Sequence, residues 1–213
     1  MTAPTQLRNH WWWRPNWRVG QRLYACHLTF ERCEALHATV DAYQDALAGV
    51  MQLDQIPRRW LHLTMQGIGF AGDMSKETLA QIVERAGEAL AELEPPTLQL
   101  GRAEVAGNGE AILMPALDGD ELTDLREVIR EAIAGVRGAD RAPSGSGPFR
   151  PHVSIAYANG EADASTAQAV LDSVRARSVR MTVTDVPLLL FHRDNRMYEW
   201  TEMLRMPIGG PNR

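Results

Sequence analysis

Two short segments of the sequence carry the same arrangement of reactive side chains. In the first, His62 and Thr64 flank Leu63, and in the second, His152 and Ser154 flank another apolar residue. Because side chains alternate between the two faces of a strand, each histidine shares a face with the hydroxyl two positions on. Each segment therefore predicts a strand with one reactive face and one face for the core.

A pair of imidazoles matches the chemistry of phosphoester hydrolysis. An unperturbed pKa near 6.5 lets histidine accept or donate a proton near neutral pH. One neutral imidazole takes a proton from water, while the other, protonated, gives one to the leaving oxygen. Thr64 and Ser154 can donate hydrogen bonds to the phosphoryl oxygens as charge shifts in the transition state. This chemistry needs no metal ion, and we expect neither a metal nor another cofactor.

The elements around these segments follow from periodicity and from turn residues. Alternation predicts a strand over 22–30, and apolar residues at helical spacing predict a helix over 36–47 that ends at Gly49. A second strand over 61–69 precedes a helix that begins at the N-cap Ser75 and is stopped by Pro95 and Pro96.

The second half of the chain repeats this mixture. A turn over 107–109 predicts a hairpin between strands at 97–105 and 110–117, and a helix runs from Asp120 to about Gly135. Residues 142–151 read as a loop. The remaining expected elements are a strand at 152–157, a helix at 165–177, and strands at 179–191 and 197–206. Strands and helices are mixed, with several hairpin-like joins, so α+β is the predicted class.

Composition narrows the function classes. The 213 residues are enough for one large domain or two lobes. The formal charge of −5 argues against a protein that coats duplex nucleic acid, because such proteins are strongly basic. There is no apolar run of about 18–20 residues, and residues 1–22 lack the apolar centre of a signal peptide, so we expect a cytoplasmic protein. The spacing of Cys26 and Cys33 matches no zinc or redox motif, and burial is expected for both.

Residues 1–21 form an arm that is rich in tryptophan and arginine and has no acidic residue. Such an arm could stack bases and touch phosphate, or it could be a strap whose indoles cover an apolar patch. We expect this arm to precede a single bilobal domain over 22–213.

The two reactive segments, within WLHLTMQGIGF and FRPHVSIAYANG, resemble the paired signatures of the two-histidine (2H) phosphoesterase superfamily. The similar branch contains bacterial 2′-5′ RNA ligase and RNA 2′,3′-cyclic phosphodiesterase proteins. The resemblance implies a bilobal α+β fold, with two pseudo-symmetric, mainly antiparallel sheets facing a central cleft and helices outside. It also implies metal-independent opening of 2′,3′-cyclic phosphates of RNA ends or nucleotides, with reversible 2′-5′ ligation. It carries over to His62, Thr64, His152 and Ser154, with His152 as base and His62 as acid.

Other side chains are weaker candidates. His27 lies in a third histidine-hydroxyl pattern and could contact substrate, as could Arg150 and Gln66, which share the faces of His152 and His62. Tyr157 is expected to point into the core. His192 could approach the mouth of the cleft. The remaining two histidines, His10 and His37, are expected at the surface.

Two alternatives stay open at this point. The cleft could belong to a non-catalytic RNA or nucleotide binding module, in which it only grips phosphate. The second alternative is a metal site built from His62 and His152 with either His27 or His192, although the sequence shows no local metal-ligand spacing. Expected partners are an RNA end or a cyclic nucleotide, no membrane is expected, and the protein is expected to be a monomer.

Overall fold

The protein is described here by a computed structural model that covers residues 4–117, 119–141 and 148–210. The helices are α1 (Glu34–Ala46), α2 (Lys76–Ala91), α3 (Asp120–Arg137) and α4 (Ala164–Ser173). The first six strands are β1 (Gln6–Leu7), β2 (Leu23–Thr29), β3 (Leu53–Gln55), β4 (His62–Phe70), β5 (Thr97–Leu100) and β6 (Glu104–Val105). The others are β7 (Ala111–Pro115), β8 (His152–Ala158), β9 (Ala162–Asp163), β10 (Val179–Thr182), β11 (Asp185–His192) and β12 (Glu199–Pro207).

The main sheet is built from two antiparallel halves. Its strand order is β12-β11-β2-β4-β8-β7-β6, and β3 pairs with β8 as an eighth strand. The halves meet where β4 lies beside β8, and the register there consists of one pair, Leu63 with Val153. The two predicted signature strands are therefore neighbours, one from each half of the molecule.

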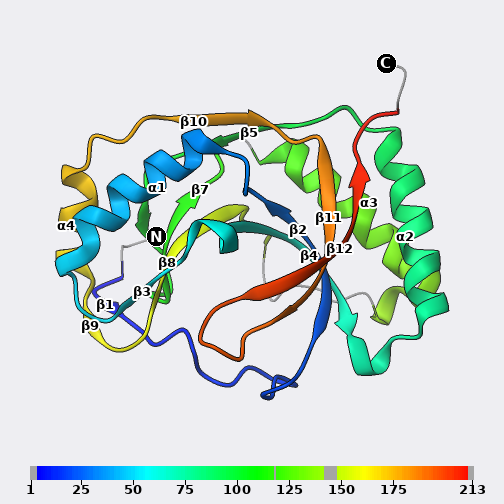
Figure 1. The fold of residues 1–213 in the computed structure, drawn as a ribbon, viewed down its shortest axis with the longest axis horizontal. Coiled ribbons are helices and arrows are strands. Elements are labelled where there is room, and N and C mark those ends of the chain that lie inside the picture. The colour runs from blue at the N-terminus through cyan, green and yellow to red at the C-terminus, as the bar shows by residue number, and fades with distance from the viewer. Residues whose placement is uncertain (1–3, 118, 142–147, 211–213) are drawn as a thin grey trace.

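Helices cover the outer side of each half. Helices α2 and α3 contact each other and lie against the half that contains β4 and β12, while α1 and α4 lie against the half that contains β8 and β6 (Figure 1). Leu63 and Val153 are fully buried on this side, as the alternation predicts. The predicted α+β class, with antiparallel strands and helices outside, is confirmed.

Some helices begin or end where the sequence predicts, and others differ from the prediction. Ser75 caps α2 by accepting a hydrogen bond from the backbone N–H of Thr78 at 3.1 Å. Helix α3 runs past Gly135 and ends at Gly138, whose φ of 88° suits the left-handed region. Gly135 lies inside this helix, where the Arg85 guanidinium of α2 is 2.8 Å from the position that a Cβ would take, so a larger residue would require Arg85 to move.

Two expected strands are each divided in the structure. Residues 97–105 split into β5 and β6, and residues 179–191 split into β10 and β11. The cause is a change of partner, because β5 and β10 pair with each other in a small sheet of their own while β6 and β11 join the main sheet. The expected helix over 165–177 ends at Ser173, since Val174 is extended. Of the expected loop at 142–151, residues 142–147 lie outside the described residues.

The N-terminal arm lies along the body of the protein. Strand β1 pairs with β9, and Leu7 is fully buried. Trp11 is partly buried against Tyr157 and donates its indole N–H to Asp54 at 3.0 Å, which agrees with the strap interpretation. Trp12 and Trp13, in contrast, are 47% and 61% exposed. The arm therefore serves partly as a cover and partly as an exposed aromatic surface.

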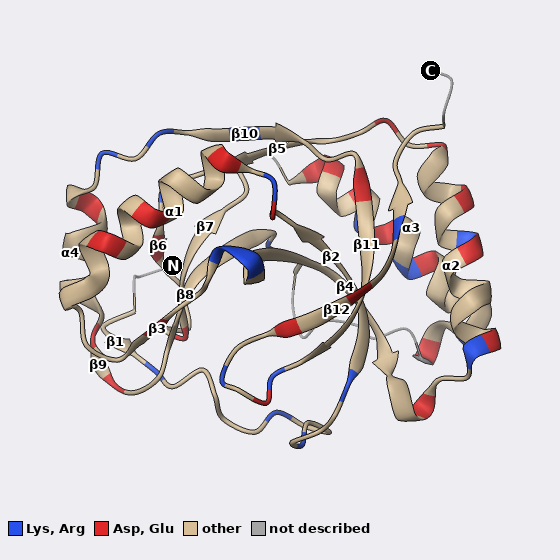
Figure 2. Cartoon of the chain, in the orientation of Figure 1, with Lys and Arg blue, Asp and Glu red and all other residues tan. Residues whose placement is uncertain are grey.

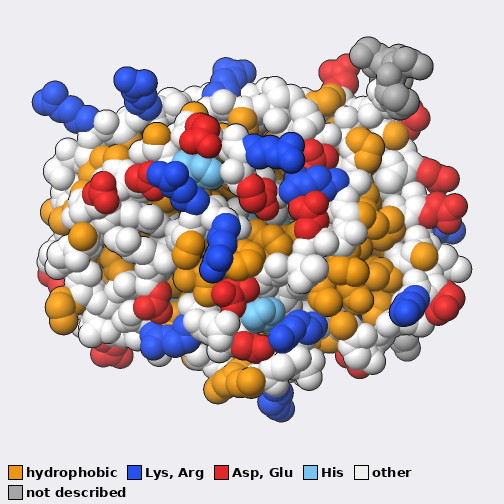
Figure 3. Space-filling model, in the orientation of Figure 1, with side chains coloured by type: hydrophobic (Ala, Val, Ile, Leu, Met, Phe, Trp, Pro, Cys, Tyr) orange, Lys and Arg blue, Asp and Glu red, His pale blue; other side chains and the backbone are white. Residues whose placement is uncertain are grey.

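Charged side chains of both signs are spread over the molecule. Figure 2 shows acidic and basic residues together on α2 and α3, whereas the charged residues of α1 and α4 are all acidic. On the face drawn in Figure 3, the Lys and Arg side chains are interspersed with Asp and Glu and form no continuous basic stripe. Among the described helices, none combines the length and apolar character needed to cross a bilayer.

Candidate active site

The four predicted catalytic side chains line one cavity at the junction of the two half-sheets. His62 and Thr64 come from β4, and His152 and Ser154 come from β8. The cavity has a volume of about 250 Å³, and we call it the chamber. Its lining is completed by His10, Trp17, His27, Tyr157, Phe191 and Tyr198.

The two imidazoles of the chamber are held in the same way. Nδ1 of His62 lies 2.9 Å from the carbonyl oxygen of Trp60, and Nδ1 of His152 lies 2.7 Å from that of Arg150. A carbonyl oxygen only accepts, so Nδ1 carries the proton in both rings. Nε2 is then the nitrogen left for chemistry, and in each ring the orienting carbonyl belongs to the residue two positions before the histidine.

His62 is the more enclosed of the pair. It is 8% exposed, and its ring stacks on that of His27 with 5.0 Å between the ring centroids. The rings of Tyr198 and Trp200 meet it edge to face, with centroids 5.9 and 5.4 Å from its own. Burial lowers the pKa of His62 to about 4, partly opposed by the backbone bond to Trp60 and reinforced by the nearby His152. His62 is therefore neutral at pH 7 and ready to accept a proton, whereas His152 is only half-buried.

His27 lies where the third histidine-hydroxyl pattern predicts. It pairs with Thr64 across β2 and β4, lines the chamber, and is 4% exposed. Burial, together with the neighbouring His62, holds its pKa well below the usual value. A second neutral imidazole thus borders the chamber.

The other two substrate candidates lie apart from the chamber. Arg150 is exposed and lines an adjoining cavity, where it lies together with His152 and Ser154. Gln66 does not share the face of His62, so that prediction is wrong. A bulge at Met65 shifts the register, so that Thr64 pairs with His27 but Gln66 pairs with Cys26, on the opposite face.

Tyr157 is a second case in which a bulge reverses the predicted face. Ser154 pairs with Leu113 and Tyr157 with Ala111, which leaves Ile155 as the extra residue in β8. Tyr157 therefore shares the face of Ser154 and lines the chamber, although it is buried as expected. Burial raises its pKa well above the usual value, while a hydrogen bond with Ser154 acts in the opposite direction.

His10 and His37 were expected at the surface, and both are buried, at 8% and 5% exposure. His10 enters the chamber from the arm, stacks on Tyr157 at 4.4 Å and lies 3.1 Å from the hydroxyl of Tyr198. Burial lowers the pKa of His10 to about 3. His37 belongs to the buried residues of α1, a helix that contacts α4, β8 and β10, and the buried stripe of this helix is wider than the periodicity implied.

Sequence reasoning missed the aromatic lining of the chamber. The ring of Trp17 packs against those of Phe191 and Phe70, with 5.5 and 5.2 Å between the ring centroids. Tyr198 lies in the β11–β12 hairpin. The tryptophans of the arm were a usable signal for Trp17, whereas no pattern marks Tyr198. His192 interacts instead with Asp194 and Glu199, at 3.6 and 4.0 Å.

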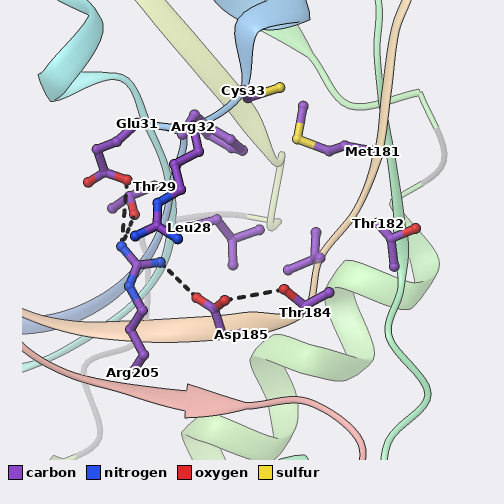
Figure 4. Close-up of a pocket in the computed structure, with 12 residues that line it drawn as sticks. Leu28, Thr29, Glu31, Arg32, Cys33, Met181, Thr182, Thr184, Asp185 and Arg205 are labelled. Carbon is purple, nitrogen blue, oxygen red and sulfur yellow. Dashed lines mark hydrogen bonds and ion pairs between the residues drawn. The ribbon is translucent and has the colours of Figure 1, made fainter.

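A separate cavity of about 440 Å³ lies at the turn between β2 and α1 (Figure 4). In this cavity, Arg205 binds Asp185 at 2.8 Å and lies 3.5 Å from Glu31. Cys33 lines this cavity and is half-buried, so the expected burial is complete only for Cys26. Burial raises the pKa of the Cys26 thiol to about 12. In the described part of the chain, no three His, Cys, Asp or Glu side chains are grouped to hold a metal ion.

The chain is similar to known proteins at the level of family and fold. A family model described as the 2′-5′ RNA ligase superfamily matches residues 33–195. TT0787 of Thermus thermophilus is 20% identical, with 90% of this chain and 100% of that chain covered and a TM-score of 0.67. E. coli LigT complexed with 3′-AMP is 16% identical over 88% and 97% of the chains, with a TM-score of 0.63. Among curated protein sequences, none matches this chain.

Proposed function

The chain belongs to the 2′-5′ RNA ligase superfamily, and from that premise we propose that it is a metal-independent phosphodiesterase that opens 2′,3′-cyclic phosphates of RNA ends or nucleotides. The family is one of phosphoesterases and RNA ligases, and LigT has been crystallised with 3′-AMP and with phosphate. The observation that carries the proposal is the convergence of two Nδ1-anchored imidazoles and two hydroxyls on one chamber.

The roles of the two histidines follow from their surroundings. The family analogy assigned His152 as base and His62 as acid, but burial keeps His62 neutral, which favours the reverse for hydrolysis. In this scheme Nε2 of His62 removes a proton from water, and the water oxygen forms a bond to phosphorus. The bond from phosphorus to one ribose oxygen breaks, and Nε2 of protonated His152 gives that oxygen its proton. The product is a phosphomonoester.

Thr64 and Ser154 supply hydrogen bonds to the non-bridging phosphoryl oxygens in this proposal. They stand two residues after the two histidines on the same faces, so each half of the molecule contributes one imidazole and one donor. A donor that meets charge as it develops lowers the barrier more than it strengthens ground-state binding. An alcohol in place of water would give a phosphodiester, which is the ligase direction of the family name.

The binding-module alternative differs in one observable respect. It predicts that nucleotides bind in the chamber and are recovered unchanged, whereas the enzyme predicts turnover. The orienting bonds on both imidazoles favour catalysis, because a phosphate grip does not require one nitrogen of each ring to be left for proton transfer.

The test is ring opening after treatment with excess chelator. Purified protein is incubated with each nucleoside 2′,3′-cyclic phosphate and with a cyclic-ended oligonucleotide, and phosphorus NMR identifies the product. We expect conversion to a phosphomonoester, lost in His62→Gln and kept in His192→Gln, a matched control outside the chamber. Absence of turnover with every substrate, or full turnover by His62→Gln, would overturn the proposal.

A further inference from the structure

One imidazole of the chamber has no role in the proposed mechanism. His27 lines the chamber together with His62 and Thr64, and it is 4% exposed. Nδ1 of His27 is buried and makes no hydrogen bond with the residues that the structure describes. Nε2 is therefore the ring nitrogen that can meet a molecule in the chamber. Because most buried polar side chains have a hydrogen-bond partner, a partner for this ring is expected from the chamber itself.

His27 offers that partner an acceptor. Burial and the neighbouring His62 hold the pKa of His27 well below its usual value, and the backbone of Cys26 opposes this only in part. The ring is therefore neutral at pH 7. A neutral imidazole carries its proton on one nitrogen and accepts a hydrogen bond at the other. With the proton on the buried Nδ1, Nε2 is the acceptor that faces the chamber.

The N-terminal arm contributes another neutral imidazole to the chamber, but both of its nitrogens already face protein groups. Nε2 of His10 lies 3.1 Å from the hydroxyl of Tyr198, and Nδ1 lies 3.5 Å from the carboxylate of Glu110. Among the described residues that line the chamber, His27 is therefore the imidazole outside the catalytic pair that can accept a hydrogen bond from a ligand.

The ring of His27 is held beside that of His62. The two rings lie within 27° of parallel, with 5.0 Å between their centroids. Phe191 also packs against His27, with 5.1 Å between the ring centroids. A hydrogen bond from a water oxygen to a ring nitrogen is about 2.8 Å long, so one water that donates to two nitrogens spans about 4.5 Å between them. The spacing of the two rings therefore suits a single bridging water.

We propose that His27 positions the attacking water, so that this protein favours hydrolysis over transfer of the phosphate to an alcohol. The inference rests on the proposed function, in which His62 is the base. The water donates one O–H to Nε2 of His62, which removes that proton, and the other O–H to Nε2 of His27. The water oxygen bonds to phosphorus, and the ribose oxygen leaves with the proton of His152. The hydrogen directed at His27 stays on its oxygen and becomes that of the new phosphomonoester.

An alcohol cannot make the same pair of hydrogen bonds. Its single O–H is given to His62, and its carbon takes the place of the second O–H of water. Nε2 of His27 then remains buried against that carbon without a hydrogen bond, which disfavours the transition state for transfer to an alcohol. A side chain at position 27 without an acceptor removes this penalty, and the discrimination between water and alcohol is lost with it.

The experiment measures how the protein divides one cyclic phosphate between water and an alcohol. A nucleoside 2′,3′-cyclic phosphate is opened in buffer that contains methanol, and phosphorus NMR separates the phosphomonoester from the methyl phosphodiester. The ratio of the two products does not depend on how much of a variant is folded. His27→Met removes the acceptor, whereas His27→Gln keeps a carbonyl acceptor on a side chain of nearly the same shape.

We expect His27→Met to raise the ratio of methyl phosphodiester to phosphomonoester about tenfold, the effect of one buried hydrogen-bonding group, and His27→Gln to raise it less. If His27→Met is inactive, His27→Leu takes its place with the same expected rise. His37→Met is the matched control, because His37 is a buried histidine of α1 that does not line the chamber, and it keeps the wild-type ratio.

An unchanged product ratio in His27→Met would overturn the inference. An equal rise in His27→Met and His27→Gln would also overturn it, because space rather than hydrogen bonding would then select the nucleophile. In both cases ring opening continues, so the proposed function stands. If the wild-type protein opens no cyclic phosphate, the proposed function fails and the inference fails with it.

Discussion

Acidification should destabilise this protein well above the pH at which its carboxylates titrate. His10 and His62 are buried, and burial lowers their pKa values to about 3 and about 4. In the unfolded chain both have the ordinary value near 6.5, so between pH 6.5 and 4 the unfolded state binds protons that the folded state excludes. The stability they contribute is therefore present above pH 6.5 and is lost as the pH falls.

The size of the loss follows from the linkage relation. At pH 5.5, one unit below the unfolded pKa, each excluded proton costs the folded state about 1.3 kcal/mol relative to pH 7.5. His10 and His62 together give about 2.6 kcal/mol, and His27, whose pKa is also lowered by burial, adds to the loss in the same direction. The carboxylate of Asp194 does not contribute in this range: burial raises its pKa, but the N–H of Gly20 and the guanidinium of Arg22 together outweigh burial and hold the pKa below its ordinary value.

The assay is urea unfolding at pH 7.5 and pH 5.5, followed by tryptophan fluorescence at constant ionic strength. We expect the free energy of unfolding to be lower at pH 5.5 by about 2.6 kcal/mol or more. In His62→Gln the difference between the two pH values should shrink by about 1.3 kcal/mol, whatever the variant's own stability. Equal stability at the two pH values, or an undiminished pH dependence in His62→Gln, would refute the reasoning.

Three further variants test separate parts of the structure. Ser154→Ala removes a phosphoryl donor, and kcat for ring opening should fall by about 10- to 1000-fold; a change confined to KM would contradict that role. Ser75→Ala removes the side-chain cap of α2 and should lower the free energy of unfolding by about 1 kcal/mol in urea, and unchanged stability would argue against the cap. Arg193→Met removes the hydrogen bonds to the carbonyls of His10 and Trp12, so trypsin should cleave faster at the exposed Arg18; an unchanged cleavage rate would show that Arg193 does not fix the arm.

The signature strands were predictable because their chemistry is local. Alternation alone placed His62 with Thr64 and His152 with Ser154, and the structure brings all four to one chamber. Gln66 followed the same alternation and was wrong, because a bulge is fixed by the partner strand and leaves no mark in the bulged sequence.

The walls of the site depend on contacts between distant segments. His10 lies in an arm without periodicity, and its burial comes from Tyr157 and Tyr198, which are far away in the chain. The split of residues 179–191 into two strands likewise reflects a change of partner from β5 to β12 and β2. Periodicity reports which residues share a face, and it cannot report which strand or arm will cover that face.

The most direct test of the central claim is a double-mutant cycle on the two histidines. Initial rates of ring opening on a 2′,3′-cyclic nucleotide are measured, in the presence of chelator, for His62→Gln, His152→Gln and the double variant. If both imidazoles transfer protons in one step, each single variant loses about 10²- to 10⁴-fold in kcat, and the double variant is little slower than the slower single. A single variant that keeps the wild-type rate would contradict the account.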